Sequence, residues 1–274
     1  MAAVTVVITS YNQGPLIREA VESALSQTVR PERIIIVDDG SDEQTSVDVL
    51  SAILDDCRHG ALDTGGVAVD FIDQVNAGPS AARNRGIAAA GTPFVVVLDG
   101  DDRLMPTFIE RTLPLLTADD SMVASSGWLR TFGVLDSVVQ PTGGDAGAFV
   151  SHNCCPATCM IRRSAWERCG GYDESMRSGF EDWDLFFDVG AGIGTERRRR
   201  EGRGPYRHRP RAPDRIPHGP GLLKRDQHDQ APRSHALPDR QASRSLRRAH
   251  RRRHPRRRSH LHEPPSHVGI VDAR

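Results

Sequence analysis

Blocks of apolar and polar positions alternate along the first hundred residues. Short runs rich in β-branched residues predict strands at 4–9, 33–37, 67–72 and 94–98. The segments between these runs carry apolar residues at helical spacing, and they predict helices that begin at Pro15, Glu43 and Pro79. The order strand, helix, strand, helix indicates an α/β layered domain with a mostly parallel central sheet.

The polar clusters of this region follow the predicted strands directly. They lie at 10–11, 38–39 and 99–102, after the first, second and fourth strands. Parallel strands bind ligands beyond their carboxyl ends, so the three clusters are expected to converge at one edge of the sheet. Neither G-x-G-x-x-G after the first strand nor G-x-x-x-x-G-K-[ST] occurs, which excludes the usual dinucleotide and P-loop sites.

The run from 94 to 102, Phe-Val-Val-Val-Leu-Asp-Gly-Asp-Asp, is a buried strand that ends in three carboxylates. Such clustering costs charge repulsion and desolvation, which a hard divalent cation bridging a phosphorylated ligand would offset. The feature therefore predicts an enzyme that handles a nucleotide diphosphate. A surface acidic turn is the alternative reading.

Five motifs together resemble the family 2 inverting glycosyltransferases over about residues 3–187. They are Val-Ile-Thr-Ser-Tyr-Asn (7–12), Val-Asp-Asp-Gly-Ser (37–41), Asn-Ala-Gly-Pro-Ser-Ala-Ala-Arg-Asn-Arg-Gly (76–86), Leu-Asp-Gly-Asp-Asp (98–102) and Phe-Glu-Asp-Trp-Asp-Leu (180–185). The resemblance implies a GT-A-type, Rossmann-like fold. It also implies transfer of a sugar from a nucleotide diphosphate sugar, with a UDP-sugar favoured, in cell-wall or polysaccharide biosynthesis.

The resemblance implies a donor site along the strand ends. Tyr11 would lie along the nucleotide base, or else pack beside the first helix. Asp39 would accept the imide N–H of the base, and Arg83 would place positive charge near a base carbonyl or the diphosphate. The nucleotide-sugar site implied in this way comprises Thr9, Tyr11, Asp39, Arg83 and Asp99, with Asp38 as an auxiliary residue that shapes the turn.

Asp99 and Asp101 match the D-x-D pair of the family. The resemblance implies that Asp99 holds mainly ribose and that Asp101 holds Mg²⁺ or Mn²⁺, with Asp102 assisting. Gly100 between them allows a close backbone approach. The metal would stabilise the departing diphosphate.

The acid pair Glu181-Asp182 matches the position of the family's general base, which the resemblance assigns to Asp182. Inversion needs one carboxylate on the face opposite the leaving diphosphate, to deprotonate a saccharide, lipid-linked or other hydroxyl acceptor. Glu181 and Trp183 are auxiliary: Glu181 raises the proton affinity of Asp182, and Trp183 either lines the acceptor site or packs in the core. An acidic helix start is the structural alternative.

Charge and composition divide the chain near residue 187. The chain has 36 basic and 36 acidic residues, but residues 1–187 hold 13 of the basic and 27 of the acidic ones. Beyond this point Arg, Pro and His recur without a helical or strand period. We expect residues 1–190 to form the catalytic domain, truncated on its acceptor side, and residues 191–274 to form a disordered basic tail.

The tail has the composition of a GC-rich coding sequence read in a shifted frame. Its basic residues are almost all Arg, with Lys224 the only lysine of the chain. A frameshift near residues 187–195 predicts that one of the other two frames encodes an apolar, periodic continuation. Re-reading the coding DNA checks this, and two frames without such a continuation would refute it.

Two other functions remain open from the sequence. One is a truncated, inactive module that binds a nucleotide sugar, and the other is a protein that binds nucleic acid through the Arg-rich tail, although no specific nucleic acid is expected. No stretch approaches the roughly 18 apolar residues of a membrane span, which predicts a cytoplasmic protein with peripheral contact at the inner membrane face. Five cysteines without paired spacing predict reduced, buried thiols and no zinc site.

Overall fold

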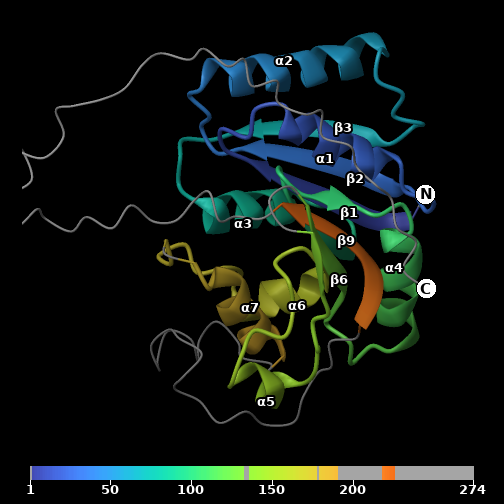
Figure 1. Cartoon of the computed structure of the whole chain (residues 1–274), viewed down its shortest axis with the longest axis vertical. Helices are drawn as coiled ribbons and strands as arrows, with labels where there is room; N and C mark the ends of the chain where they lie inside the picture. The colour runs from blue at the N-terminus through green and yellow to red at the C-terminus, as the bar shows by residue number, and fades with distance from the viewer. Residues whose placement is uncertain (1, 133–135, 178, 191–217, 226–274) are drawn as a thin grey trace, which may run out of the picture. The chain divides into compact units, whose positions relative to one another are not determined.

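The computed structural model describes residues 2–132, 136–177, 179–190 and 218–225, the last of these for the backbone only. Its strands form one sheet in the order β3-β2-β1-β4-β8-β6-β9-β5, with β7 paired to β6. Figure 1 shows this sheet with helices packed on it. The protein is of the α/β class, and the N-terminal strands of its sheet are parallel. Both features agree with the sequence prediction.

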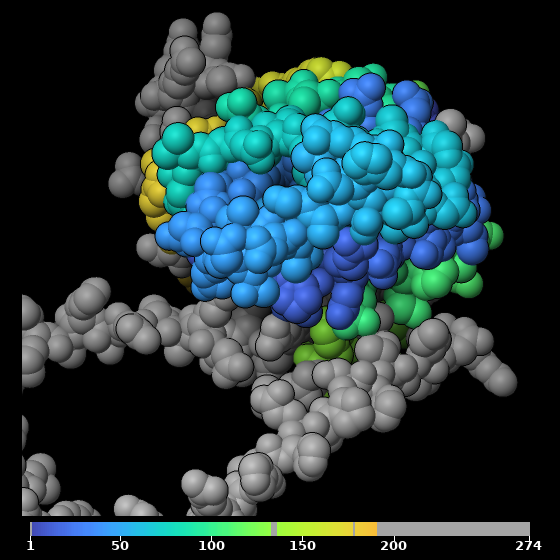
Figure 2. Space-filling model, turned by 90° about the horizontal axis from the view of Figure 1, so that it is seen from above, coloured from blue at the N-terminus to red at the C-terminus, as the bar shows by residue number. Residues whose placement is uncertain are grey.

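The parallel half of the sheet contains the four predicted strands. They are β1 (Ala2–Ser10), β2 (Pro31–Asp38), β3 (Ala68–Asp73) and β4 (Phe94–Asp99). The connecting helices are α1 (Leu16–Leu25), α2 (Gln44–His59) and α3 (Pro79–Ala89). Helix α2 runs further than predicted and is capped after His59 by Gly60, whose φ of 71° is a left-handed conformation that glycine adopts without strain. Figure 2 shows α2 and the segment after it covering one face of the molecule.

The antiparallel half follows β4 and was not predicted from the sequence. Strand β8 (Met160–Arg162) pairs antiparallel with β4 and β6 (Ala124–Phe132), and the short β7 (Ser137–Val139) pairs with β6. The other elements here are β5 (Arg103–Leu104), α4 (Phe108–Ala118), α5 (Ala146–Phe149), α6 (Arg163–Cys169) and α7 (Glu181–Gly190).

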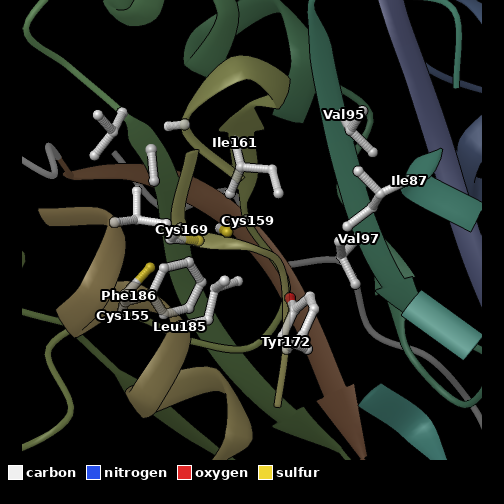
Figure 3. Close-up of a cluster of buried hydrophobic side chains, with 14 of the residues drawn as sticks. Ile87, Val95, Val97, Cys155, Cys159, Ile161, Cys169, Tyr172, Leu185 and Phe186 are labelled. Carbon is white, nitrogen blue, oxygen red and sulfur yellow. The ribbon is translucent and has the colours of Figure 1, made fainter. Parts of the chain in front are cut away.

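The core has two parts, one on each face of the sheet. Successive side chains of a strand point to opposite faces, so Val7 lies in one part while Val6 and Ile8 lie in the other. The first part joins the sheet to α3, α6 and α7 and is shown in Figure 3. Four of the five cysteines are buried and all five are free thiols, as the sequence predicts.

Part of the predicted tail is ordered as a strand. Strand β9 (His218–Arg225) pairs parallel with β6 and antiparallel with β5, within the segment for which the sequence predicts no regular structure. Backbone hydrogen bonds along a strand edge require no side-chain period, which is why the pattern missed it. The rest of 191–274 lies outside the described residues, and the disorder of that segment and the frameshift near residues 187–195 stay predictions. Among the described helices, none is long and apolar enough to cross a membrane.

Candidate functional site

Strands β1, β2 and β4 bring their carboxyl ends to one edge of the sheet. The register aligns Thr9 with both Val37 and Asp99, and Ser10 with Asp38. The hydroxyl of Thr9 donates to Asp99 Oδ1 over 3.4 Å. The polar clusters that the sequence predicts to converge therefore share one rim, where open α/β sheets bind their ligands.

Tyr11 lies just beyond β1 at this rim. Its side chain is 45% exposed, far more than the residues that pack α1 against the sheet. The exposed ring offers stacking area to a planar ligand. Stacking on a nucleotide base stays a prediction.

The carboxylate of Asp39 ties the end of β2 to the loop before α3. Oδ1 accepts hydrogen bonds from Gln74 Nε2 at 2.7 Å and from the amide of Ala77 at 2.8 Å, and Oδ2 accepts from the amide of Gly78 at 2.8 Å. These contacts span 35 to 39 residues, so Asp39 does more than form a local turn. A carboxylate has about four acceptor positions, and the protein fills three of those of Asp39. The fourth is left for the imide N–H that the family resemblance implies as its partner.

Asp38 shapes the turn after β2. It accepts hydrogen bonds from the hydroxyl of Ser41 at 2.6 Å and from the amide of Ser41 at 3.1 Å. This is an Asx-type turn, in which an aspartate holds its own backbone a few residues on. The auxiliary role that the sequence gives Asp38 is consistent with these contacts.

Arg83 joins the donor strands to the acid pair of α7. It is 4% exposed, and its Nη2 and Nη1 each lie 2.8 Å from a carboxylate oxygen, Asp99 Oδ1 and Glu181 Oε1 respectively. Burial by itself lowers the pKa of Arg83, but the charge of Asp99, followed by Tyr172 and Glu181, raises it well above its usual value. The sequence predicted a nucleotide contact for Arg83, whereas both terminal nitrogens bind protein carboxylates here.

The acidic turn after β4 places its three carboxylates in different surroundings. Asp99 binds Arg83, and Asp101 is half-buried. Asp102 is 1% exposed and accepts a hydrogen bond from the hydroxyl of Thr158 at 3.4 Å. Gly100 donates to Thr9 O at 2.8 Å, and a Cβ at this position would lie 2.7 Å from the same oxygen. Only glycine permits this approach of the turn to β1.

The carboxylates of this turn are the groups that would hold a divalent metal. Within the described ranges, no group of three or more His, Cys, Asp or Glu side chains could hold a metal ion. Carboxylate oxygen is nevertheless the donor that Mg²⁺ and Mn²⁺ prefer, and Mg²⁺ is commonly held by one or two carboxylates plus substrate phosphates. The donor set therefore suits a metal that arrives with a diphosphate and binds Asp101. The deep burial of Asp102 does not support its predicted assistance.

Asp182 lies in the first turn of α7 and is held by Asn153. Nδ2 of Asn153 donates to Asp182 Oδ2 at 2.9 Å, and the amide of Cys155 donates to Asn153 Oδ1 at 3.2 Å, which fixes the orientation of the carboxamide. Burial and the neighbouring charge of Glu181 raise the pKa of Asp182, while the amide of Trp183, Arg83 and Asn153 oppose the rise. A carboxylate with a raised pKa suits a general base. Sequence reasoning missed Asn153, because its contact with Asp182 joins two segments 29 residues apart.

Trp183 packs through its indole. Its Nε1 donates to Phe149 O at 2.7 Å, and the ring lies against the buried cluster of α5 and α7. The sequence left two roles open for Trp183, packing in the core and lining the acceptor site, and the structure shows the packing. Lining of the acceptor site stays a prediction.

The loop that precedes α7 is held to α3 by Asn84, another residue that the sequence analysis missed. Asn84 Oδ1 accepts from the amide of Tyr172 at 2.8 Å and from Trp166 Nε1 at 3.1 Å, and Nδ2 donates to Tyr172 O at 3.0 Å. The Tyr172 ring in turn lies 5.5 Å from the Arg83 guanidinium carbon. Asn84 and Arg83, neighbours on α3, thus fix the loop and the acid pair.

An open cleft of about 830 Å³ lies beside the site along α3. None of the predicted site residues lines it, although Gln74 and Ala77 in its wall donate hydrogen bonds to Asp39. Its walls are Asp73, Gln74, Val75, Ala77, Ala81, Asn84, Arg85, Ala88, Trp166, Gly170 and Glu174.

Comparison with known protein families gives a match over most of the described domain. The sequence model of glycosyl transferase family 2 matches residues 5–170. The chain is 36% identical over 120 residues to the uncharacterized glycosyltransferase YibD of Escherichia coli and 35% identical over 121 residues to the succinoglycan biosynthesis protein ExoO of Rhizobium meliloti. These matches cover 44% of this chain but only 32% of either relative, so the chain matches about a third of their length.

Two solved structures share the fold. TarS of S. aureus, residues 1–349 in complex with UDP, superposes with a TM-score of 0.59 and 16% identity, covering 81% of this chain and 60% of that one. Mannosyltransferase PcManGT of Pyrobaculum calidifontis, in complex with GDP-Man and Mn²⁺, gives a TM-score of 0.53 and 18% identity, covering 87% and 58%. At such identities the likeness shows the fold alone, and it confirms the predicted GT-A type.

Proposed function

Because the chain belongs to glycosyl transferase family 2, we propose that it transfers a sugar from a nucleotide diphosphate sugar to an acceptor hydroxyl with inversion. The observation that carries the proposal is the pair of ion contacts of Arg83. One buried guanidinium binds Asp99 of the donor rim and Glu181 of the acid pair, each at 2.8 Å. The contacts bring the end of β4 and the start of α7 together, which supports one site made of the donor strand and the candidate base next to Glu181.

The chain's own residues supply two functions in this proposal. Asp101 and the rim of β1, β2 and β4 bind and orient the donor, and Asp182 takes the proton of the attacking hydroxyl. A bound Mg²⁺ or Mn²⁺, held by Asp101, would neutralise charge on the departing diphosphate. Transfer in one displacement needs no covalent intermediate, which agrees with a single candidate base.

The choice of uridine rests on related proteins. TarS is solved with UDP and with UDP-GlcNAc, whereas PcManGT is solved with GDP-Man and Mn²⁺. Tyr11 and Asp39 suit a planar base with a ring N–H donor, which uracil offers as its imide N–H and guanine as its lactam N–H. We favour a UDP-sugar donor, and a saccharide acceptor by analogy with ExoO, a succinoglycan biosynthesis protein.

Calorimetric titration with UDP and Mn²⁺ tests the donor site. Asp101→Asn should weaken metal-dependent UDP binding by at least about tenfold, or about 1.4 kcal/mol, because it removes the carboxylate that holds the metal. Asp70→Asn is the matched control, since Asp70 of β3 forms a surface ion pair with Arg33 of β2. Equal metal-dependent UDP binding in the wild type, Asp101→Asn and Asp70→Asn would refute the role of Asp101. Binding in the wild type without donor hydrolysis or transfer would favour the inactive binding module.

A further inference from the structure

Phe180, directly before the acid pair, combines two unfavourable features. Its side chain is 65% exposed, and its φ of 68° lies in the left-handed region that residues other than glycine rarely adopt. Exposed apolar surface and backbone strain both cost free energy, and such strain tends to be kept where a site requires it. The residue lies two positions before Asp182.

Phe180 forms a pair with Trp183. The ring centroids are 6.1 Å apart and the planes meet at 60°, an edge-to-face arrangement that orients the Phe180 ring. Trp183 is itself fixed, because its indole N–H donates to Phe149 O at 2.7 Å. The fixed indole of Trp183 therefore supports the exposed ring of Phe180 from one side.

The aromatic pair and the candidate base are held by the same segment of the chain. Phe149 fixes Trp183, and Asn153, four residues later, donates to Asp182 at 2.9 Å. In Figure 1 the turn that leads into α7 lies on the same side of the sheet as the start of α3, and Glu181 of α7 reaches Arg83 of α3. A group resting on the pair is therefore held in a constant position relative to Asp182.

We propose that Phe180 and Trp183 form an acceptor subsite on which a sugar ring of an uncharged saccharide stacks. This inference rests on the proposed function and names the acceptor class. A pyranose ring has a face of C–H groups that packs on an aromatic ring, and hydroxyls at its edge that can reach a nearby base. Of the three acidic residues in the first turn of α7, Asp184 is buried and Glu181 is paired with Arg83, so it is the charge of Asp182 that disfavours an anionic acceptor.

Saccharide binding to the full-length protein in the absence of nucleotide tests the subsite. Cellotetraose, maltotetraose, mannotetraose and chitotetraose are titrated separately, with binding followed by saturation-transfer NMR. The wild type should bind at least one of them saturably. Phe180→Ala should weaken that binding about tenfold, whereas Phe180→Tyr, which keeps the ring, should retain it.

Two controls separate the possible causes of a loss. Val138→Ala removes a comparably exposed apolar side chain on β7 and should leave saccharide binding unchanged. The midpoint of thermal unfolding confirms that each variant is folded. Equal affinity of the wild type and Phe180→Ala, or no binding of any of the four saccharides, would overturn the subsite.

UDP binding with Mn²⁺ in the same samples distinguishes this inference from the proposed function. If UDP binds and the saccharide result is negative, the subsite is refuted while the donor site stands. If UDP does not bind the wild type, the proposed function itself fails. Loss of saccharide binding with full UDP binding in Phe180→Ala supports both.

Discussion

Replacing Asp182 by asparagine should lower the rate of sugar transfer by about 10²- to 10⁴-fold while UDP binding is retained. The amide keeps the size of the side chain but cannot accept the proton of the acceptor hydroxyl. Asp182 lies on α7 and not on the strand ends that form the donor rim, so donor affinity should not depend on its charge. Transfer is measured with radiolabelled UDP-sugar, and binding by calorimetry. An equal loss of binding and transfer would show that the roles of Asp101 and Asp182 are misassigned.

The pH dependence of transfer gives an independent check on the same residue. Burial, followed by the charge of Glu181, raises the pKa of Asp182 above its usual value of 3.8, so transfer should rise with pH through that raised pKa. Asn153→Ala removes a donor to the ionised form and should move this rise to higher pH. If the transfer rate of Asn153→Ala rises at the same pH as that of the wild type, Asp182 is not the titrating group.

The contribution of Asp182 to the free energy of unfolding should fall as pH rises, whereas the rate of transfer should increase. A pKa raised by folding means that the protonated form is preferred in the native state. The corresponding stability is present below the unfolded value of 3.8 and is lost as pH rises through the folded pKa. Asp182→Asn should therefore be at least as stable as the wild type at neutral pH, which also shows that lost transfer is not lost folding.

Replacing Arg83 by methionine should lower the free energy of unfolding by about 3 kcal/mol or more. The change leaves two carboxylates that are mostly buried, Asp99 at 15% and Glu181 at 13% side-chain exposure, without the cation they share. Uncompensated charge in such surroundings is costly, and the aliphatic side chain replaces only the packing. UDP binding and transfer should both fall, since the variant disturbs the rim and the acid pair together. Urea unfolding measures the change.

Two further variants separate the ion contacts from packing. Arg18→Met breaks an ion pair with Asp56 whose side chains are 33% and 35% exposed, and it should cost no more than about 1 kcal/mol. Adding Asp99→Asn and Glu181→Gln to Arg83→Met removes the unpaired charges and should restore part of the stability. If Arg83→Met costs no more than Arg18→Met, Arg83 does not join the two halves of the site.

The sequence determined the parallel half of the domain and the positions of its polar rim. Runs such as 94–98 bury side chains on both faces of the sheet, and they are followed by aspartate or glycine. The strands and their ends can therefore be predicted from short stretches of sequence. The parallel order then requires that Thr9, Asp38 and Asp99 meet at one edge. Family motifs added the candidate roles of Asp101 and Asp182, which the experiments above test.

Only the tertiary structure decided which polar groups meet. Arg83 and Glu181 are 98 residues apart, Asn84 and Tyr172 are 88 apart, and Asn153 and Asp182 are 29 apart. No local period encodes such pairs, because each depends on how segments distant in the sequence pack against one another. The antiparallel half and β9 are of the same kind, since all of their strands except β7 are defined by pairing with neighbours that are distant in the sequence. Periodicity along a chain records which side chains are buried, whereas the partners of buried polar groups are set by packing between distant segments.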